Sequence, residues 1–329
     1  MNGRMTSPAN TAAHWAIRAA DIPRQAAPDA RPRGGLAGGW ARRRPLTAFF
    51  GLGLPTAYLL AAVWGLAHHR QIPGGGAAGA LGIKPDELAG GLLILGLFPA
   101  ALFVTWATGG RQGIRAFFGR LLRWRVGVGW WLTVLVALPG LTVGLSLLFG
   151  DELKEVNLTS LMVSQVGLLL LNLVLVNLWE EAVWTGVVQT RLEQRWGVLT
   201  SAALTAVPFA AVHVPLVFFS DQLPTLLDIL GAFVIYFVLG LIVRSMYAVL
   251  RRSTLDSLLL VAVAHSVFNR TNNNDGILAN LVDGDMRLVA GLLAAIVLTL
   301  TIRLAYRRRM TRDFAHGLDA SDPSVASVR

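Results

Sequence analysis

The chain contains no cysteine and has few charged residues: Asp, Glu, Lys and Arg make up 15% of its 329 residues. The lack of cysteine excludes disulfide bonds, a cysteine nucleophile and thiolate metal sites. About one quarter of the residues in an average soluble domain are charged, so the low charge excludes an ordinary soluble protein. Acidic residues are scarcer than basic ones, 19 against 29. An acidic side chain within an apolar segment is therefore a conspicuous feature.

Long hydrophobic segments are present instead. Hydrophobic residues make up 54% of the chain, and a membrane-spanning helix needs about 20 mostly apolar residues. The candidate spans are 46–66, 88–108, 128–149, 158–188, 198–218, 226–247, 255–268 and 288–306. The fourth is overlong and the seventh is short. The sequence predicts an all-α, polytopic membrane protein of about eight transmembrane helices over 46–306, with a disordered basic tail at 1–45 and a polar tail at 307–329.

Basic residues are concentrated in alternate connections between these spans. They occur in the N-terminal tail, in loops 109–127, 189–197 and 244–254, and at the C-terminus; Arg244, Arg251 and Arg252 are assigned to the third loop. The other connections are poorer in Arg and Lys, and the later ones contain acidic residues, among them Asp221. The positive-inside rule then predicts a multi-pass protein of the cell membrane with both termini cytoplasmic. In such a protein the net charge of +10 indicates contact with membrane lipids and not with nucleic acid.

Two adjacent carboxylates, Glu180 and Glu181, lie within the fourth span. An ionised carboxylate at membrane depth costs at least about 2 kcal/mol, so such residues usually face a protein interior or a water-filled cavity. Residues four apart share a helix face, which predicts one polar stripe composed of Asn177, Glu181, Thr185 and Gln189. Glu180 points about 100° away from Glu181. The two acids are therefore expected to have different neighbours.

Two histidines lie in other apolar spans, His213 in the fifth and His265 in the seventh, with Asn269 one turn after His265. Glutamate and histidine together can hold and deprotonate a water molecule, directly or through a metal. A second histidine with an amide can stabilise a developing oxyanion. These groups describe amide hydrolysis by water. The chain lacks the HExxH, GxGD and GxSG motifs of other intramembrane proteases.

These residues resemble three motifs of the CPBP family, also called the Abi or CAAX-protease family, whose best-known members are type II CAAX prenyl proteases. The motif EExxxR compares with residues 180–185, FxxxH with Phe209 and His213, and HxxxN with His265 and Asn269. The resemblance covers about 113–269. It implies an eight-helix membrane endopeptidase with an intramembrane cavity and a catalytic core at about 158–270.

The resemblance also implies roles for single residues. Glu180 would be the base that activates water, with His213 as its partner. His265 and Asn269 would position the substrate carbonyl and stabilise the oxyanion, while Glu181 would support the site. The supporting residues around them would be Trp184, Thr185, Phe209 and Asn177.

Two points stay open in the sequence. The arginine of EExxxR is Thr185 here, so Glu181 lacks a local cation and is expected to be protonated or to interact with Asn177 or another helix. Glu180, His213 and His265 would suit a divalent metal such as zinc, with water completing the shell, but a metal-free water held by Glu and His is also workable. By linear position, Glu180 falls toward the cytosolic half of its span and His213 toward the outer half of its own.

The sequence thus favours an intramembrane endopeptidase acting on a peptide or protein, including prenylated or membrane-anchored ones. The departure at Thr185 supports an alternative: a non-catalytic membrane scaffold or bacteriocin-immunity protein that keeps the fold. A proton-coupled transporter using the two glutamates is a third reading. It would be expected to show inverted repeats, and none is apparent.

Overall fold

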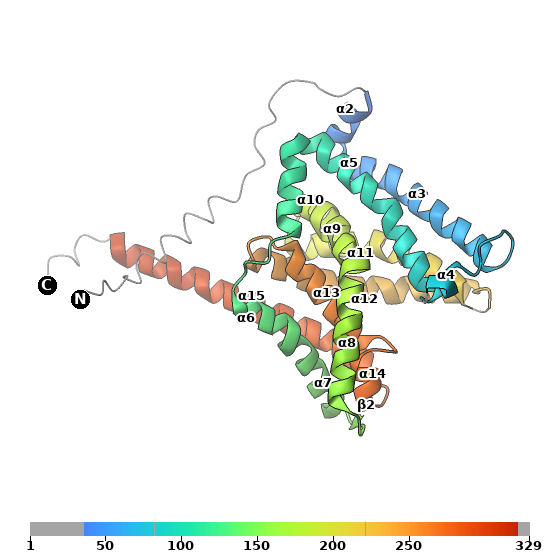
Figure 1. Cartoon of the computed structure of the whole chain (residues 1–329). Helices are drawn as coiled ribbons and strands as arrows, with labels where there is room; N and C mark the ends of the chain where they lie inside the picture. The colour runs from blue at the N-terminus through green and yellow to red at the C-terminus, as the bar shows by residue number, and fades with distance from the viewer. Residues whose placement is uncertain (1–35, 82, 221, 322–329) are drawn as a thin grey trace, which may run out of the picture.

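The computed structural model describes residues 36–81, 83–220 and 222–321, which are almost entirely helical (Figure 1). Within these residues, seven helices are long and apolar enough to cross a membrane. These are α3 (Pro45–His68), α5 (Pro85–Leu121), α6 to α7 (Val128–Leu148), α8 to α10 (Leu158–Leu192), α11 with its 3-10 extension (Val198–Phe219), α12 (Leu226–Ser253) and the first part of α15 (Arg287–Ala305). The all-α, multi-pass architecture predicted from the sequence is confirmed.

Shorter elements complete the chain. They are α2 (Leu36–Arg43), α4 (Ala77–Leu81), α13 (Leu258–Asn272), α14 (Ile277–Leu281) and the strands β1 (Glu152–Leu153) and β2 (Val282–Asp283). The predicted tails differ in part from this arrangement, because α2 lies within 1–45 and α15 continues to Ser321. Residues 1–35 and 322–329 of those tails, and Asp221 of an acidic connection, lie outside the described residues.

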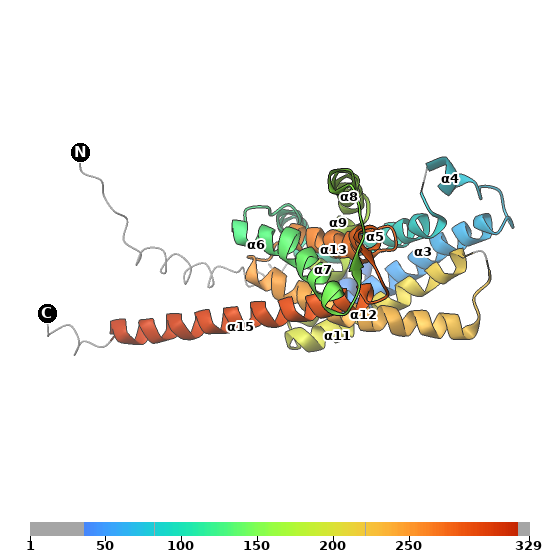
Figure 2. The same ribbon diagram turned by 90° about the horizontal axis from the view of Figure 1, so that it is seen from below.

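The seventh predicted span, 255–268, corresponds to α13, which is shorter than the hydrocarbon core of a membrane. Its 15 residues extend about 22 Å, whereas the hydrocarbon core is about 30 Å thick. Twelve of those 15 residues are buried, and Figure 2 shows α13 in the middle of the helix bundle. A short helix is tolerated there because its ends contact protein instead of lipid. The span predicted from the sequence was short because the apolar run ends at Phe268.

Connections that the sequence placed on the same side of the membrane are joined to one another. At one end, Arg120 pairs with Asp256, and both Arg251 and Arg252 pair with Glu193. At the other end, β1 pairs with β2 in an antiparallel arrangement. Each of these contacts joins connections that the charge pattern assigns to the same side.

The helix that carries the two glutamates is long and irregular. It consists of α8 (Leu158–Asn172), α9 (Leu178–Val183) and α10 (Thr190–Leu192), joined by π-helical segments Leu173–Asn177 and Trp184–Gln189. Its first part, α8, stands out from one face of the bundle (Figure 2) and has a single buried residue, Gln165. The side-chain oxygen of Gln165 accepts hydrogen bonds from Arg270, at 2.9 and 3.1 Å. This polar contact ties α8 to the end of α13.

Helices α3 and α5 lie side by side (Figure 1) and approach closely at small residues. A Cβ atom added to Gly96 would lie 2.5 Å from the backbone nitrogen of Ala57 and would also overlap its Cα. Small residues allow such backbone contacts between membrane helices. Only glycine fits at position 96 without separating the two helices.

Replacing Gly96 by alanine is therefore expected to destabilise the protein by about 1–3 kcal/mol, the usual range for an overpacked interior. The measurement is the thermal unfolding of the purified protein in detergent. Gly91→Ala in the same helix is the matched control, because a Cβ there has no neighbour within 4 Å. Equal melting temperatures for the two variants would show that the contact between α3 and α5 is looser than described.

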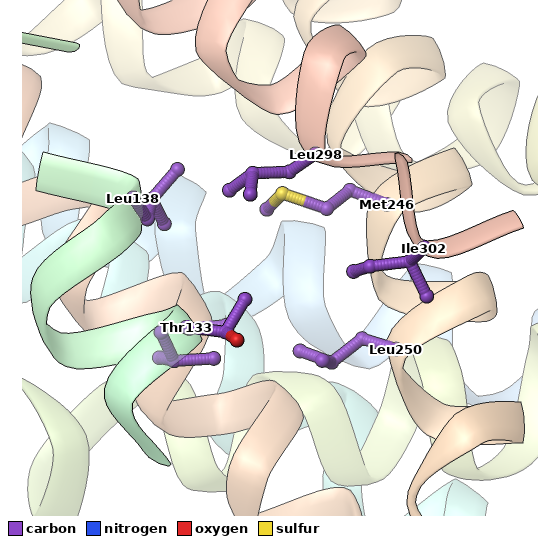
Figure 3. A pocket seen from close by; sticks show the side chains of 8 residues that line it. Thr133, Leu138, Met246, Leu250, Leu298 and Ile302 are labelled. Carbon is purple, nitrogen blue, oxygen red and sulfur yellow. The ribbon is translucent and has the colours of Figure 1, made fainter. Parts of the chain in front are cut away.

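A small apolar pocket lies between several of the helices (Figure 3). Its lining comes from the segment Thr133–Ala137 and from α7 (Leu138–Leu148), α12, α13 and α15. The lining residues are Thr133, Val134, Leu138, Met246, Leu250, Ala264, Leu298 and Ile302. None of the predicted site residues lines this pocket, so it is separate from the candidate site.

Candidate active site

The two adjacent carboxylates lie on α9, between the two π-helical segments. Such wider turns within α-helices are frequent at functional sites. Both residues are buried, with Glu180 4% and Glu181 0% exposed as whole residues. The predicted stripe is also buried, since Asn177, Thr185 and Gln189 are each 0% exposed. As predicted from the helical period, the two acids have different neighbours.

Glu181 is held by four hydrogen bonds. Its Oε1 accepts from Arg244 Nη2 at 2.6 Å and from His265 Nδ1 at 2.8 Å, while Oε2 accepts from Arg244 Nη1 at 2.7 Å and from Thr185 Oγ1 at 2.5 Å. An ionised carboxylate offers about four lone-pair positions. Glu181 uses all of them, so it is fixed as a carboxylate and has no position left to accept a proton from water.

The cation beside Glu181 is Arg244, which the sequence analysis assigned wrongly to a basic loop. Arg244 lies within α12, nine residues before Ser253, or about 13 Å along the helix, and its side chain is 0% exposed. Of the alternatives considered for Glu181, the interaction with another helix is correct, and protonation is wrong. Asn177 does not contact Glu181 through a hydrogen bond; its oxygen accepts from Ser266 at 3.0 Å.

His265 lies between the two carboxylates. Its Nδ1 is 2.8 Å from Glu181 Oε1 and 3.8 Å from Glu180 Oε2. Because Glu181 can only accept, the Nδ1 of His265 carries a proton and donates it. The ring is thereby fixed, and its Nε2 is the atom left for another partner.

Glu180 faces His213 across a short gap. His213 Nδ1 is 2.7 Å from the carbonyl oxygen of Phe209, which can only accept. In the neutral ring Nε2 is therefore an acceptor, and it faces Glu180 Oε1 at 3.6 Å. This Oε1 is buried without a hydrogen-bond donor among the residues that the structure describes. Two acceptors at this distance repel each other unless they share a donor, and such a donor lies beside the pair because 3.6 Å leaves no room on the line between them.

Aromatic side chains surround these polar groups. Trp184 is 0% exposed and its ring lies 5.8 Å from that of Phe209, whose ring is 4.3 Å from His213. The sequence analysis missed Tyr236, 4.9 Å from the His213 ring, and Tyr247, 5.5 Å from the His265 ring. No spacing pattern pointed to them. The rarity of tyrosine, with four in the chain, was the only signal for these two residues.

Asn269 lies one turn after His265 on α13, as predicted, and is half-buried. Its side chain makes no hydrogen bond to the residues that the structure describes, whereas its backbone oxygen accepts from Asn273. The amide is therefore free to bind another group. Four of the five predicted catalytic side chains are joined by contacts of 2.8 to 3.8 Å, and Asn269 is placed near them by the helix alone.

Glu180, His213 and His265 do not fit a zinc site as they are arranged. Within the described part of the chain, no group of three His, Asp or Glu side chains could hold a metal ion. The ring nitrogen of His265 that approaches Glu180 is Nδ1, at 3.8 Å, and this atom is already bonded to Glu181. The Nδ1 bond of His213 leaves its Nε2 available, so His265 is the ligand that does not fit.

Comparison with known families agrees with this geometry. Residues 162–271 match the family model described as type II CAAX prenyl endopeptidase Rce1-like, and this range contains every predicted catalytic residue. A search of curated proteins finds no match to the chain. The matched family is described as an endopeptidase, and the apolar helices make this chain a multi-pass membrane protein. Residues 162–271, with the whole of the candidate site, therefore belong to the CPBP family of CAAX-type membrane proteases.

Proposed function

We propose that this protein is an intramembrane endopeptidase in which Glu180 and His213 activate a water molecule without a metal. The facing acceptors Glu180 Oε1 and His213 Nε2, 3.6 Å apart, are the observation that carries this proposal. A water that lies beside the pair donates one O–H to each and keeps its lone pairs for a substrate carbonyl. Glu181 is unsuited to this task because its lone pairs are already used.

Hydrolysis then proceeds by general acid and base catalysis. Glu180 takes one proton from the water as its oxygen attacks the carbonyl carbon, which gives a tetrahedral intermediate with a negative oxygen. The same carboxyl returns the proton to the amide nitrogen as the C–N bond breaks. His213 holds the water through its second hydrogen and orients the attack.

The opposite side of the site would stabilise the intermediate. The free amide of Asn269 donates to the oxyanion, as does His265 Nε2 when the imidazole carries two protons. The Nδ1 bond to Glu181 keeps this ring in place throughout. Donors fixed before the reaction contribute most, because they need no rearrangement as charge develops.

The substrate class follows from the position of the site. The His213 side chain is 19% exposed, against 6% for Glu180 and 8% for His265, so the site opens on the side of His213. A peptide held at the membrane by a prenyl group or by its own apolar segment would be presented to it. Placement in the cell membrane with both termini cytoplasmic completes the proposal, and it rests on the basic residues of the alternate connections.

The experiment is cleavage of fluorogenic peptides, farnesylated and unprenylated, by the purified protein in liposomes. We expect cleavage that is stronger for the farnesylated peptides and unchanged by a zinc chelator. Loss of activity with the chelator, restored by added zinc, would contradict the metal-free mechanism. A folded protein that cleaves none of the peptides would contradict the proposed activity on this substrate class.

No observation now favours the scaffold over the enzyme. The sequence supported a non-catalytic reading because the motif arginine is Thr185. The structure provides a guanidinium at the same carboxylate from α12, so the departure at Thr185 no longer counts against catalysis.

A further inference from the structure

Arg244 contacts residues of the first two motifs directly. It is linked to the third motif through Glu181, which both Arg244 and a residue of the third motif hydrogen-bond. Its guanidinium binds both oxygens of Glu181 in the first motif. Its central carbon lies 4.6 Å from the ring centroid of Phe209 in the second motif, a cation–π distance. His265 of the third motif donates to the same Glu181 oxygen that Arg244 Nη2 binds.

We propose that Arg244 is the positioning residue that replaces the arginine of the first motif. In this exchange the guanidinium beside Glu181 comes from position 244 and not from position 185, which holds the smaller Thr185. An arginine at position 185 would reach Glu181 from one turn along the same helix. Here the guanidinium arrives from α12, and the residue at 185 is small enough to admit it. Thr185 donates to Glu181 and accepts from Arg244 Nη1 at 3.2 Å.

The exchange is reciprocal because the two arginines would need the same space. Thr185 Oγ1 already lies within hydrogen-bond distance of both Glu181 and Arg244. A second guanidinium at position 185 would place two cations against one buried carboxylate that has no free lone pair. A single Thr185→Arg change is therefore expected to damage the protein and not to repair it.

Arg244 acts on the reaction through Glu181, and this role rests on the proposed peptidase function. The bidentate contact fixes the plane of the carboxylate, and the carboxylate fixes the ring of His265 through Nδ1. Without Arg244, Glu181 can rotate, and His265 Nε2 no longer has a fixed direction. The substrate still binds, but the chemical step slows.

The test is a double-mutant cycle of Arg244→Met, Thr185→Arg and the combined variant. The measurements are kcat and KM with a farnesylated fluorogenic peptide, and the melting temperature in detergent. Arg252→Met is the matched control, because Arg252 is on the same helix but half exposed and paired with Glu193 at its end. We expect each single change to lower kcat about 100-fold with little change in KM, since one fixed donor at a developing charge contributes about this much.

The combined variant is expected to recover to within about tenfold of the wild-type kcat, because coupled residues are strongly non-additive. Its melting temperature is also expected to exceed that of both single variants. The exchange would be overturned by a combined variant whose kcat falls by the product of the two single-variant factors. An Arg244→Met variant with wild-type kcat would also overturn it. The melting temperatures test the exchange even without a cleaved peptide, so its failure and that of the proposed function are distinguishable.

Discussion

Replacing Glu180 by glutamine is expected to lower kcat by about 10²–10⁴-fold, the usual contribution of a general base. Glutamine keeps the size of the side chain but cannot take a proton from water. Of the two adjacent carboxylates, Glu180 alone has an oxygen free to do so, because the four lone-pair positions of Glu181 are used. The measurement is the rate of peptide cleavage at saturating substrate, with KM expected to change little.

The control for this prediction is Glu155→Gln, which removes an exposed carboxylate from the connection before α8. It should cleave at the wild-type rate. The Glu180→Gln protein should also keep the wild-type melting temperature, since Glu180 Oε1 has no donor to lose among the described residues. A Glu180→Gln variant with more than a tenth of wild-type kcat would rule out Glu180 as the base.

Replacing Glu181 by glutamine is expected to have its largest effect on stability, a loss of about 3–5 kcal/mol, because it leaves a buried charge without its partner. Arg244 is 0% exposed and is surrounded by protein, so the guanidinium cannot turn to water. The amide also presents an N–H toward donors that now bind a carboxylate oxygen. The measurement is thermal unfolding in detergent, where we expect the melting temperature to fall by roughly 10 °C.

A double variant separates this charge effect from packing. Glu181→Leu with Arg244→Met removes both charges and keeps similar volume, and such exchanges are often neutral or stabilising. It should regain most of the lost stability while cleavage stays slow, because His265 has lost the acceptor for its Nδ1. Equal melting temperatures for the Glu181→Gln protein and the wild type would show that the buried pair is not important for stability.

Most of the helices and the catalytic candidates could be predicted because both depend on local patterns. Apolar runs of about 20 residues predict membrane helices, and spacings of four place Phe209 with His213, and His265 with Asn269. The depth of the site could not be predicted in this way. The sequence put Glu180 and His213 in opposite halves of the membrane, whereas their side chains are 3.6 Å apart. The helix that carries Glu180 has 35 residues, about 52 Å, so position along it does not measure depth in the membrane.

Arg244 shows a second limit. A charged residue near the end of an apolar run is most simply assigned to a loop, and the positive-inside rule supported that assignment. Its partner lies 63 residues away on another helix, and no spacing rule connects the two positions. The absence of an arginine at 185 was visible in the sequence, but the compensation for it was visible only in three dimensions.

The exposure of α8 means that the lipid bilayer can affect the position of Glu180. Because one residue of α8 is buried, most of this helix is available to contact hydrocarbon chains, and a helix longer than the local membrane adjusts by tilting. The same continuous helix carries Glu180 two turns beyond α8, so a change of tilt in α8 is transmitted toward the carboxylate. Gln165 and Arg270 oppose that movement at one point. The distance between Glu180 and His213 thus depends on membrane thickness as well as on the contacts of neighbouring side chains.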